Sequence, residues 1–147
     1  MSGINHSHIE PIYTLSVAAR LSGTPQHSIR QYVDKGLLIP FKKKSNRHLF
    51  SDVDIERLMW IKKNLEEKGM SFAGIKSLLA LIPCWKITNC NLESRKNCDA
   101  YYSSDFPCWE ASDKGKECKN KDCRVCEVYQ VVDSDLELKS VLRELIP

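Results

Sequence analysis

The chain has 147 residues, with 22 Lys and Arg against 19 Asp and Glu and a formal net charge of +3. This length allows one medium domain or two small ones. The N-terminus is polar and lacks the apolar core of a signal peptide, and no apolar run approaches the ~18 residues of a membrane span. Composition therefore predicts a cytoplasmic protein without membrane association.

Charge and cysteine content divide the chain into two halves. Residues 1–82 contain twelve basic and seven acidic residues, net +5, and no cysteine, whereas residues 83–147 contain ten and twelve, net −2, and all seven cysteines. A basic half suits a polyanion, because binding releases counterions from the phosphates. Cytoplasmic thiols are kept reduced, so a cysteine cluster there indicates metal ligation before disulfides.

The first helical patterns lie near the start of the basic half. Thr14 can cap a helix that ends at Gly23. Thr24-Pro25 can start a second helix, with Thr24 as N-cap and Pro25 as its first residue, which runs to about Lys35. Two short helices joined by a turn that contains glycine form a helix-turn-helix motif.

A basic hairpin and two further helices are predicted next. Residues 37–50 place apolar ends around a basic tip, which is typical of a two-stranded wing that carries cations to phosphates; a solvated loop is the alternative. Ser51 with Asp54 resembles a capping box that opens a third helix, ended by Gly69, and Ser71 can cap a fourth. The apolar stripes of both helices are expected to form the core.

Four segments of this half carry a family likeness: residues 13–18 (YTLSVA), 29–40 (IRQYVDKGLLIP), 47–55 (RHLFSDVDI) and 68–75 (KGMSFAGI). Over residues 12–82 the sequence resembles the MerR family of bacterial regulators. The resemblance implies a winged helix-turn-helix domain whose second helix enters the major groove of promoter DNA and whose wing contacts the backbone. It also implies a homodimer that distorts the promoter spacer at which RNA polymerase acts.

Candidate DNA contacts lie on the second helix and the wing. By position, Arg30 and Tyr32 match the family's arginine and second aromatic residue, and Arg47 matches its basic wing residue. Gln31 and Val33 replace the usual aromatic and acidic residues, which could shift operator preference or a packing contact. The residues expected to reach base edges or phosphates are Gln26, His27, Arg30, Gln31, Tyr32, Lys42, Lys43, Lys44 and Arg47.

The chain departs from the family after residue 82. Members usually continue into a long helix that pairs with that of a partner, whereas Pro83 and Cys84 interrupt this helix here. Dimerisation must then use another surface. The segment 133–146 fits a short amphipathic helix, which can pack on its own chain or on a partner.

The cysteines point to a thiolate-ligated centre formed by Cys84, Cys90, Cys98, Cys108, Cys118, Cys123 and Cys126. Pro-Cys-Trp occurs at 83–85 and again at 107–109, which divides the segment into halves with three and four cysteines. Four thiolates complete a tetrahedral zinc site or the corners of a [4Fe–4S] cubane. Trp85 and Trp109 can shield such a centre from water. The spacing separates neither zinc from an iron–sulfur cluster nor one centre from two.

The segment also resembles the tandem Cys-Trp modules appended to bacterial sensory proteins. We therefore predict a mainly α protein with a flexible N-terminus (1–12), a winged helix-turn-helix domain (13–82), a small cysteine-rich module stabilised by a metal or cluster (83–130) and a C-terminal amphipathic helix (131–147). The predicted function is a DNA-binding transcriptional regulator whose module senses redox, gas or metal state.

Two other functions fit the same residues. The protein could be an adaptor with structural zinc, in which the metal serves only to stabilise the fold of a region poor in apolar side chains. It could also be a thiol or electron-transfer protein built on a winged-helix scaffold. The sequence contains no evident nucleophile–base pair, phosphate loop or carboxylate pair, so an enzyme is not expected.

Overall fold

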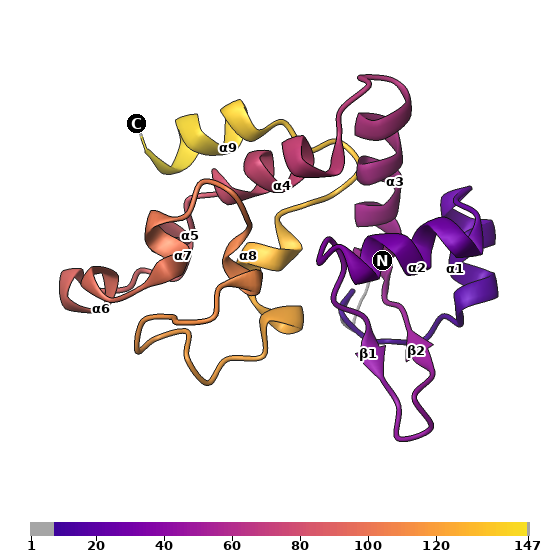
Figure 1. Cartoon of the computed structure of the whole chain (residues 1–147), viewed down its shortest axis with the longest axis horizontal. Coiled ribbons are helices and arrows are strands. Elements are labelled where there is room, and N and C mark those ends of the chain that lie inside the picture. The colour runs from indigo at the N-terminus through magenta and orange to yellow at the C-terminus, as the bar shows by residue number, and fades with distance from the viewer. Residues whose placement is uncertain (1–7, 147) are drawn as a thin grey trace. The chain divides into compact units, whose positions relative to one another are not determined.

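The computed structural model describes residues 8–146 and is mainly α-helical, as predicted (Figure 1). The chain forms two compact units. The first contains the residues up to Lys68 together with Val132–Asp135, and the second contains Gly69–Val131 and the residues from Leu136 onward. Within residues 8–146, every helix is too short or too polar to cross a bilayer.

The helix-turn-helix consists of α1 (Leu15–Ser22) and α2 (Gln26–Asp34). The Thr14 side chain caps α1, and Gly23 ends it at a φ of 68°, a left-handed conformation that glycine adopts without steric cost. The predicted start of α2 was wrong by one residue. Pro25 has a ψ of 148°, which leaves it outside the helix in the N-cap position, so Thr24 does not serve as the cap.

The predicted wing is confirmed. Strand β1 (Phe41–Lys42) pairs antiparallel with β2 (His48–Leu49). At the tip between them Asn46 has a φ of 67°, which asparagine tolerates better than most residues. An isolated antiparallel bridge joins Tyr13 to Phe50 directly after the wing, so the chain entering α1 is tied to the base of the hairpin.

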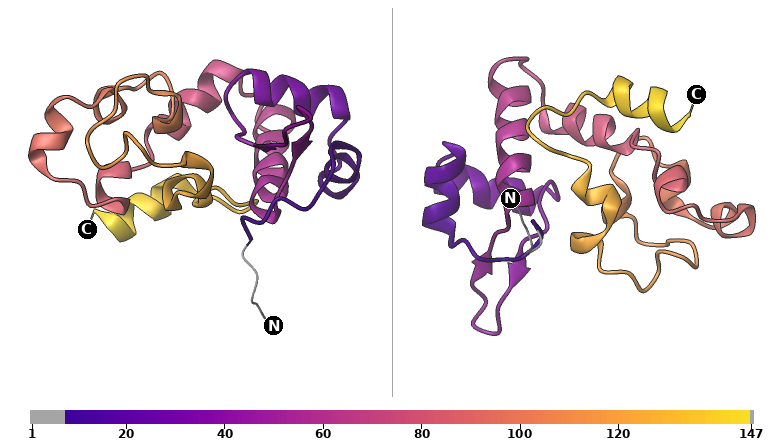
Figure 2. Two further views of the ribbon diagram at one scale, coloured as in Figure 1. Left: turned by 90° about the horizontal axis from the view of Figure 1, so that it is seen from below. Right: turned by 180° about the vertical axis from the view of Figure 1, so that it is seen from behind.

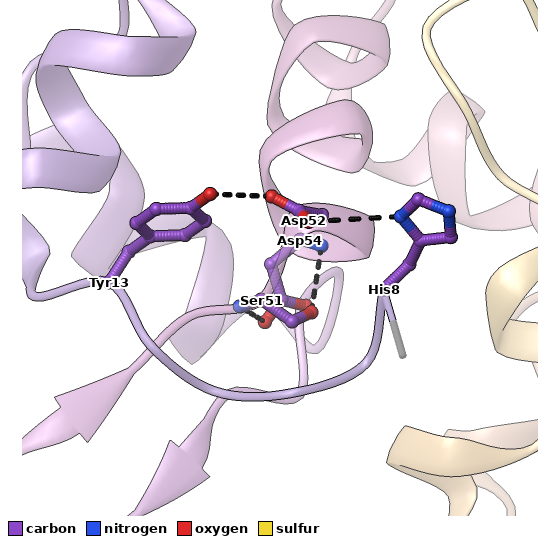
Figure 3. A network of polar contacts seen from close by, with 5 residues as sticks. All are labelled: His8, Tyr13, Ser51, Asp52 and Asp54. Carbon is purple, nitrogen blue, oxygen red and sulfur yellow. Dashed lines mark hydrogen bonds and ion pairs between the residues drawn. The ribbon is translucent and has the colours of Figure 1, made fainter. Parts of the chain in front are cut away.

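Residues 8–12, which the sequence predicts to be flexible, make backbone hydrogen bonds at both ends: the Val53 amide donates to the His8 carbonyl at 3.1 Å, and the Ile12 amide donates to the Phe50 carbonyl at 3.0 Å. Residues 1–7 lie outside the described part of the chain. The Tyr13 hydroxyl donates a hydrogen bond of 2.7 Å to the Asp52 carboxylate, and Nδ1 of His8 lies 3.7 Å from the same carboxylate (Figure 3). The hydrogen bond to Asp52 raises the pKa of the Tyr13 phenol, because loss of the proton would place two negative charges side by side.

Helix α3 (Asp52–Glu66) begins at the predicted capping box. The Asp54 amide donates to the Ser51 hydroxyl at 3.2 Å, and the Ser51 amide donates to the Asp54 carboxylate at 2.9 Å (Figure 3). These two bonds satisfy amides that have no partner within the helix. The helix supplies the centre of the core of this unit, which includes Ala18, Ile29, Leu37, Phe50, Leu58, Trp60 and Ile61.

A buried arginine joins α3 to the segment between α2 and the wing. The Arg57 side chain is completely buried, and its Nε donates a hydrogen bond of 3.0 Å to the Leu37 carbonyl. A buried guanidinium is stable only where its N–H groups find acceptors. The bond therefore fixes the backbone at the point where the helix-turn-helix passes into the wing.

The second unit is built from short helices and loops (Figures 1 and 2). Its helical elements, of which the η elements are 3₁₀ turns, are α4 (Phe72–Ala80), α5 (Cys84–Ile87), α6 (Leu92–Lys96), α7 (Asp99–Tyr102), η2 (Cys108–Glu110), η3 (Cys123–Val125), α8 (Glu127–Gln130) and α9 (Leu138–Leu145). Helix α9 lies within the segment predicted to be amphipathic, and none of its side chains is fully buried.

Helix α4 belongs to the second unit, although the sequence placed the domain boundary after residue 82. Ser71 caps the helix as predicted, and Gly69 turns the chain before it at a φ of 64°. Lys76 on α4 forms an ion pair of 3.0 Å with Glu110 in η2. Both side chains are three-quarters buried, so this pair fastens α4 to the cysteine-rich segment.

Replacing Arg57 with Met should lower the free energy of unfolding by about 1–3 kcal/mol, because the Leu37 carbonyl loses its charged donor. Urea unfolding of the full chain measures this. Arg20→Met is the matched control: Arg20 is exposed at the end of α1, and its loss should change stability by less than about 0.5 kcal/mol. Equal stability of the two variants would contradict the role assigned to Arg57.

Candidate DNA-binding surface and cysteine pocket

A groove in the first unit is lined by the start of α1, by α2 and by the wing. Its volume, open mouth included, is about 1410 Å³. Gln26 and Arg30 reach it from α2, while Lys43 and Arg47 reach it from the wing. Three of these four side chains are cations, and all four are exposed. The groove therefore joins helix and wing residues into one positively charged surface.

The other candidate DNA contacts divide into exposed and buried residues. Exposed side chains outside the lining of the groove are His27, Gln31, Lys42 and Lys44. Tyr32 is only 5% exposed, and burial raises the pKa of its phenol. A ring in the core of the helix-turn-helix cannot stack in a DNA groove, so Tyr32 has a packing role in place of the expected DNA contact.

Two hydroxyl residues at the start of α1 also line the groove and were not among the predicted contacts. The hydroxyls of Thr14 and Ser16 lie 3.3 Å apart at this helix N-terminus. Helix N-termini and hydroxyl side chains commonly bind phosphates. The sequence identified Thr14 only as a cap; its place beside α2 and the wing depends on the tertiary fold. Asn46 at the wing tip lines the groove as well.

All seven cysteines line a single pocket in the second unit. The pocket has a volume of about 600 Å³, counted together with the open space at its mouth. Apart from the sulfur atoms, its surface is almost entirely apolar. Trp85 and Trp109 also line it, in the position expected of residues that shield a centre from water. The two cysteine groups recognised in the sequence thus face one common space.

The two cysteines of the Pro-Cys-Trp motifs are hydrogen-bonded to each other. The Cys108 thiol donates to Cys84, which raises the pKa of Cys108 and lowers that of Cys84. Burial adds to the shift at Cys108 and is the main reason why the pKa of Cys118 is also raised. A soft metal binds cysteine as the thiolate, so binding to both sulfurs would release their protons.

Polar contacts fix the loops around the pocket. Lys114 Nζ donates to Cys123 Sγ at 3.1 Å. The Glu117 carboxylate accepts hydrogen bonds from the Ser94 hydroxyl and from the Asn91 amide, the latter at 3.0 Å. These bonds lower the pKa of Glu117. The loop after η2 is thereby joined to α6 in the first half of the module.

The donor set fits a thiophilic group. Seven thiols around one apolar pocket provide more than the four that a tetrahedral zinc ion or a cubane cluster requires. Within residues 8–146, no three His, Cys, Asp or Glu side chains converge closely enough to hold a single metal ion. The seven cysteines therefore line one pocket without three of them meeting at one point.

Comparison with known proteins identifies the first part of the chain. Residues 13–82 match the family described as MerR HTH family regulatory protein. This span is similar to the helix-turn-helix domain of that family, and the match ends before the first cysteine. Over 71 residues it is 37% identical to a Streptomyces coelicolor protein named as the heat shock protein HspR, covering 48% of this chain and 47% of that protein.

A second relative is the HTH-type transcriptional regulator GlnR of Bacillus cereus. It is 34% identical over 71 residues, which cover 48% of this chain and 54% of GlnR. The chain thus spans about half the length of the curated relatives it matches. The likeness supports the DNA-binding half of the prediction and does not extend to the cysteine pocket.

Replacing Gly115 with Ala should destabilise the second unit. A Cβ at this position would lie 2.6 Å from the Ser94 carbonyl oxygen, so the two halves of the module would have to move apart, at a cost of about 1–3 kcal/mol. Thermal unfolding followed by circular dichroism measures the loss.

Gly74→Ala is the matched control in the same unit. Its Cβ would meet nothing closer than 3.4 Å, and alanine favours the interior of α4 by up to about 1 kcal/mol. A Gly115→Ala protein as stable as Gly74→Ala would show that the close approach to Ser94 is not required.

Proposed function

We propose that the protein is a DNA-binding transcriptional regulator that acts as a homodimer on promoter DNA used by RNA polymerase. In this proposal the cysteine pocket binds an iron–sulfur cluster and senses redox or gas state. The observation that carries it is the presence, on one chain, of a MerR-family helix-turn-helix domain and a pocket lined by seven thiols.

The groove of the first unit supports the DNA-binding role. Arg30 lies on the exposed face of α2, the helix that carries base-reading residues in helix-turn-helix proteins. Lys43 and Arg47 extend the cationic surface along the wing, where they can pair with phosphates. Base discrimination is therefore assigned to the helix, and general affinity to the wing.

The pocket of the second unit supports the sensing role. Cysteine thiolates hold iron–sulfur clusters, and such a cluster would supply a group whose charge and integrity change with redox state. Trp85 and Trp109 limit the access of water. The ammonium group of Lys114, at 3.1 Å from Cys123, offsets part of the negative charge that several thiolates would accumulate.

Helix α4 gives the pocket a route to the DNA-binding domain. It lies within the span that matches the family, and it also belongs to the unit that contains the pocket. Its ion pair with Glu110 joins it to the turn that begins with Cys108. A change in how Cys108 is held would therefore alter the support of α4.

Arg30→Ala should weaken binding to the preferred DNA by about 1–3 kcal/mol and change binding to unrelated DNA much less. Lys43→Ala should weaken binding to all duplexes alike and reduce the slope of log affinity against log salt by about 1. The preferred duplex is first selected from random-sequence DNA, and affinities are then measured at several salt concentrations.

Lys63→Ala is the control for both variants, because Lys63 is exposed on α3 and does not line the groove. It should bind DNA as the wild type does. An Arg30→Ala protein that keeps full affinity and selectivity for the preferred duplex would exclude α2 as the base-reading helix.

Protein purified without oxygen should show a broad absorption band near ~400 nm, with iron and sulfide in near-equal amounts. Absorption from 300 to 700 nm and analysis of iron, sulfide and zinc on one sample test this. Exposure to air should bleach the band and change the affinity for the preferred duplex. A colourless protein with stoichiometric zinc would replace the cluster by a structural metal and remove the sensing role.

A further inference from the structure

The cysteine module contains an internal repeat, visible first in its two Pro-Cys-Trp motifs. Pro83 occupies the N-cap of α5 and Cys84 is the first residue of that helix. Pro107 occupies the N-cap of η2 and Cys108 is the first residue of that turn. The two cysteines therefore have the same place in two equivalent helical turns.

A second motif is repeated in the same order. Cys98 is the N-cap of α7, and an acidic residue, a small apolar residue and a tyrosine follow it. Cys126 is the N-cap of α8 and is followed in the same way. The residues two positions after these cysteines are both buried, Ala100 at 9% and Val128 at 1% exposure.

Aromatic contacts join the two motifs within each repeat. Trp85 meets Tyr101 edge to face, with ring centroids 5.4 Å apart and an interplanar angle of 87°. In the second repeat Trp109 meets Tyr129 at 5.4 Å and 84°. All four rings line the cysteine pocket. Nearly identical geometry at equivalent positions indicates two copies of one structural unit.

The two repeats pack against each other reciprocally. Helix α5 of the first contacts α8 of the second, and α7 of the first contacts η2 of the second. Cys98 and Ala100 are buried together with Ala111, and Cys108 packs against them. Cys84 and Cys108, at equivalent positions of the two repeats, line the same pocket. Each repeat thus brings two equivalent cysteines to the shared pocket.

Cys90, Cys118 and Cys123 lie outside the repeat. Thirteen residues separate Cys84 from Cys98 and seventeen separate Cys108 from Cys126, and the intervening segments fold differently. The first contains α6, whereas the second contains turns and η3. Cys123 accepts a hydrogen bond from Lys114, so its sulfur already has a cationic partner.

We propose that Cys84, Cys98, Cys108 and Cys126 are the ligands of a single centre and that the other three cysteines surround it without being required. The inference rests on the proposed function, since it assigns the ligands of that same pocket. Four thiolates saturate the corners of one cubane cluster, so equivalent pairs from two repeats complete a site with no further donor. The remaining three thiols also line the pocket.

The decisive experiment uses the full-length triple variant Cys90→Ser/Cys118→Ser/Cys123→Ser, which is purified without oxygen in parallel with the wild type. Iron, sulfide and zinc contents per chain and the absorption spectrum are compared. We expect the triple variant to keep the content and spectrum of the wild type. This is a positive result that an unfolded protein could not give, and loss of the centre would overturn the ligand assignment.

Single Cys→Ser variants of the four proposed ligands complete the test. Each should weaken retention of the centre by about tenfold or more. In other metal sites, even the loss of a residue that only hydrogen-bonds to a ligand lowers metal affinity by that factor. Retention of a full centre by any one of them would also overturn the assignment. A wild-type protein that holds neither metal nor cluster would instead refute the proposed function itself, together with the inference built on it.

Discussion

The constraint on the cysteine-rich segment is its small apolar burial: residues 83–131 bury few large apolar side chains and contain all seven cysteines. Its buried hydrophobic residues are Cys98, Ala100, Ala111, Val128 and Tyr129. Small domains with so little apolar burial usually need disulfides or metal ions in order to fold. Ligand binding to thiolates supplies free energy directly to folding. Under the proposed function, the module would change its structure on loss of the centre, which an ordinary hydrophobic core does not do.

The first unit is stabilised by helix caps and a hydrophobic core and does not require a bound centre. Its helices have caps and glycine ends, and its core contains Phe50, Leu58 and Trp60. Arg57 fixes the backbone between α2 and the wing, so both DNA-facing elements keep their relative position from within the unit. Under the proposed function, the chain combines a stable DNA-binding surface with a module whose order depends on a bound centre. A signal is more naturally transmitted by changing the conditional part than by unfolding the stable one.

Local features were predictable from the sequence because they depend on near neighbours. Ser51 and Asp54 lie three residues apart, and their capping box follows from that spacing. Tyr32 was misassigned, because its orientation toward the core depends on residues distant in sequence. The single pocket could not be predicted either, since cysteine spacing in loops does not say where the sulfurs converge. The ion pair of Lys76 with Glu110, which joins α4 to a segment distant in sequence, could not be predicted either.

The position of α4 restricts how the two functions can be coupled. Of the residues that match the MerR family, only 69–82 belong to the unit that contains the pocket. Glu110 lies two residues after Cys108, in the same 3₁₀ turn, so any movement of that cysteine moves the partner of Lys76. Because both members of the ion pair are largely buried, separating them leaves charges without compensation. Repositioning α4 as a whole avoids this cost, and under the proposed function we therefore expect this helix to be the element that responds to the state of the centre.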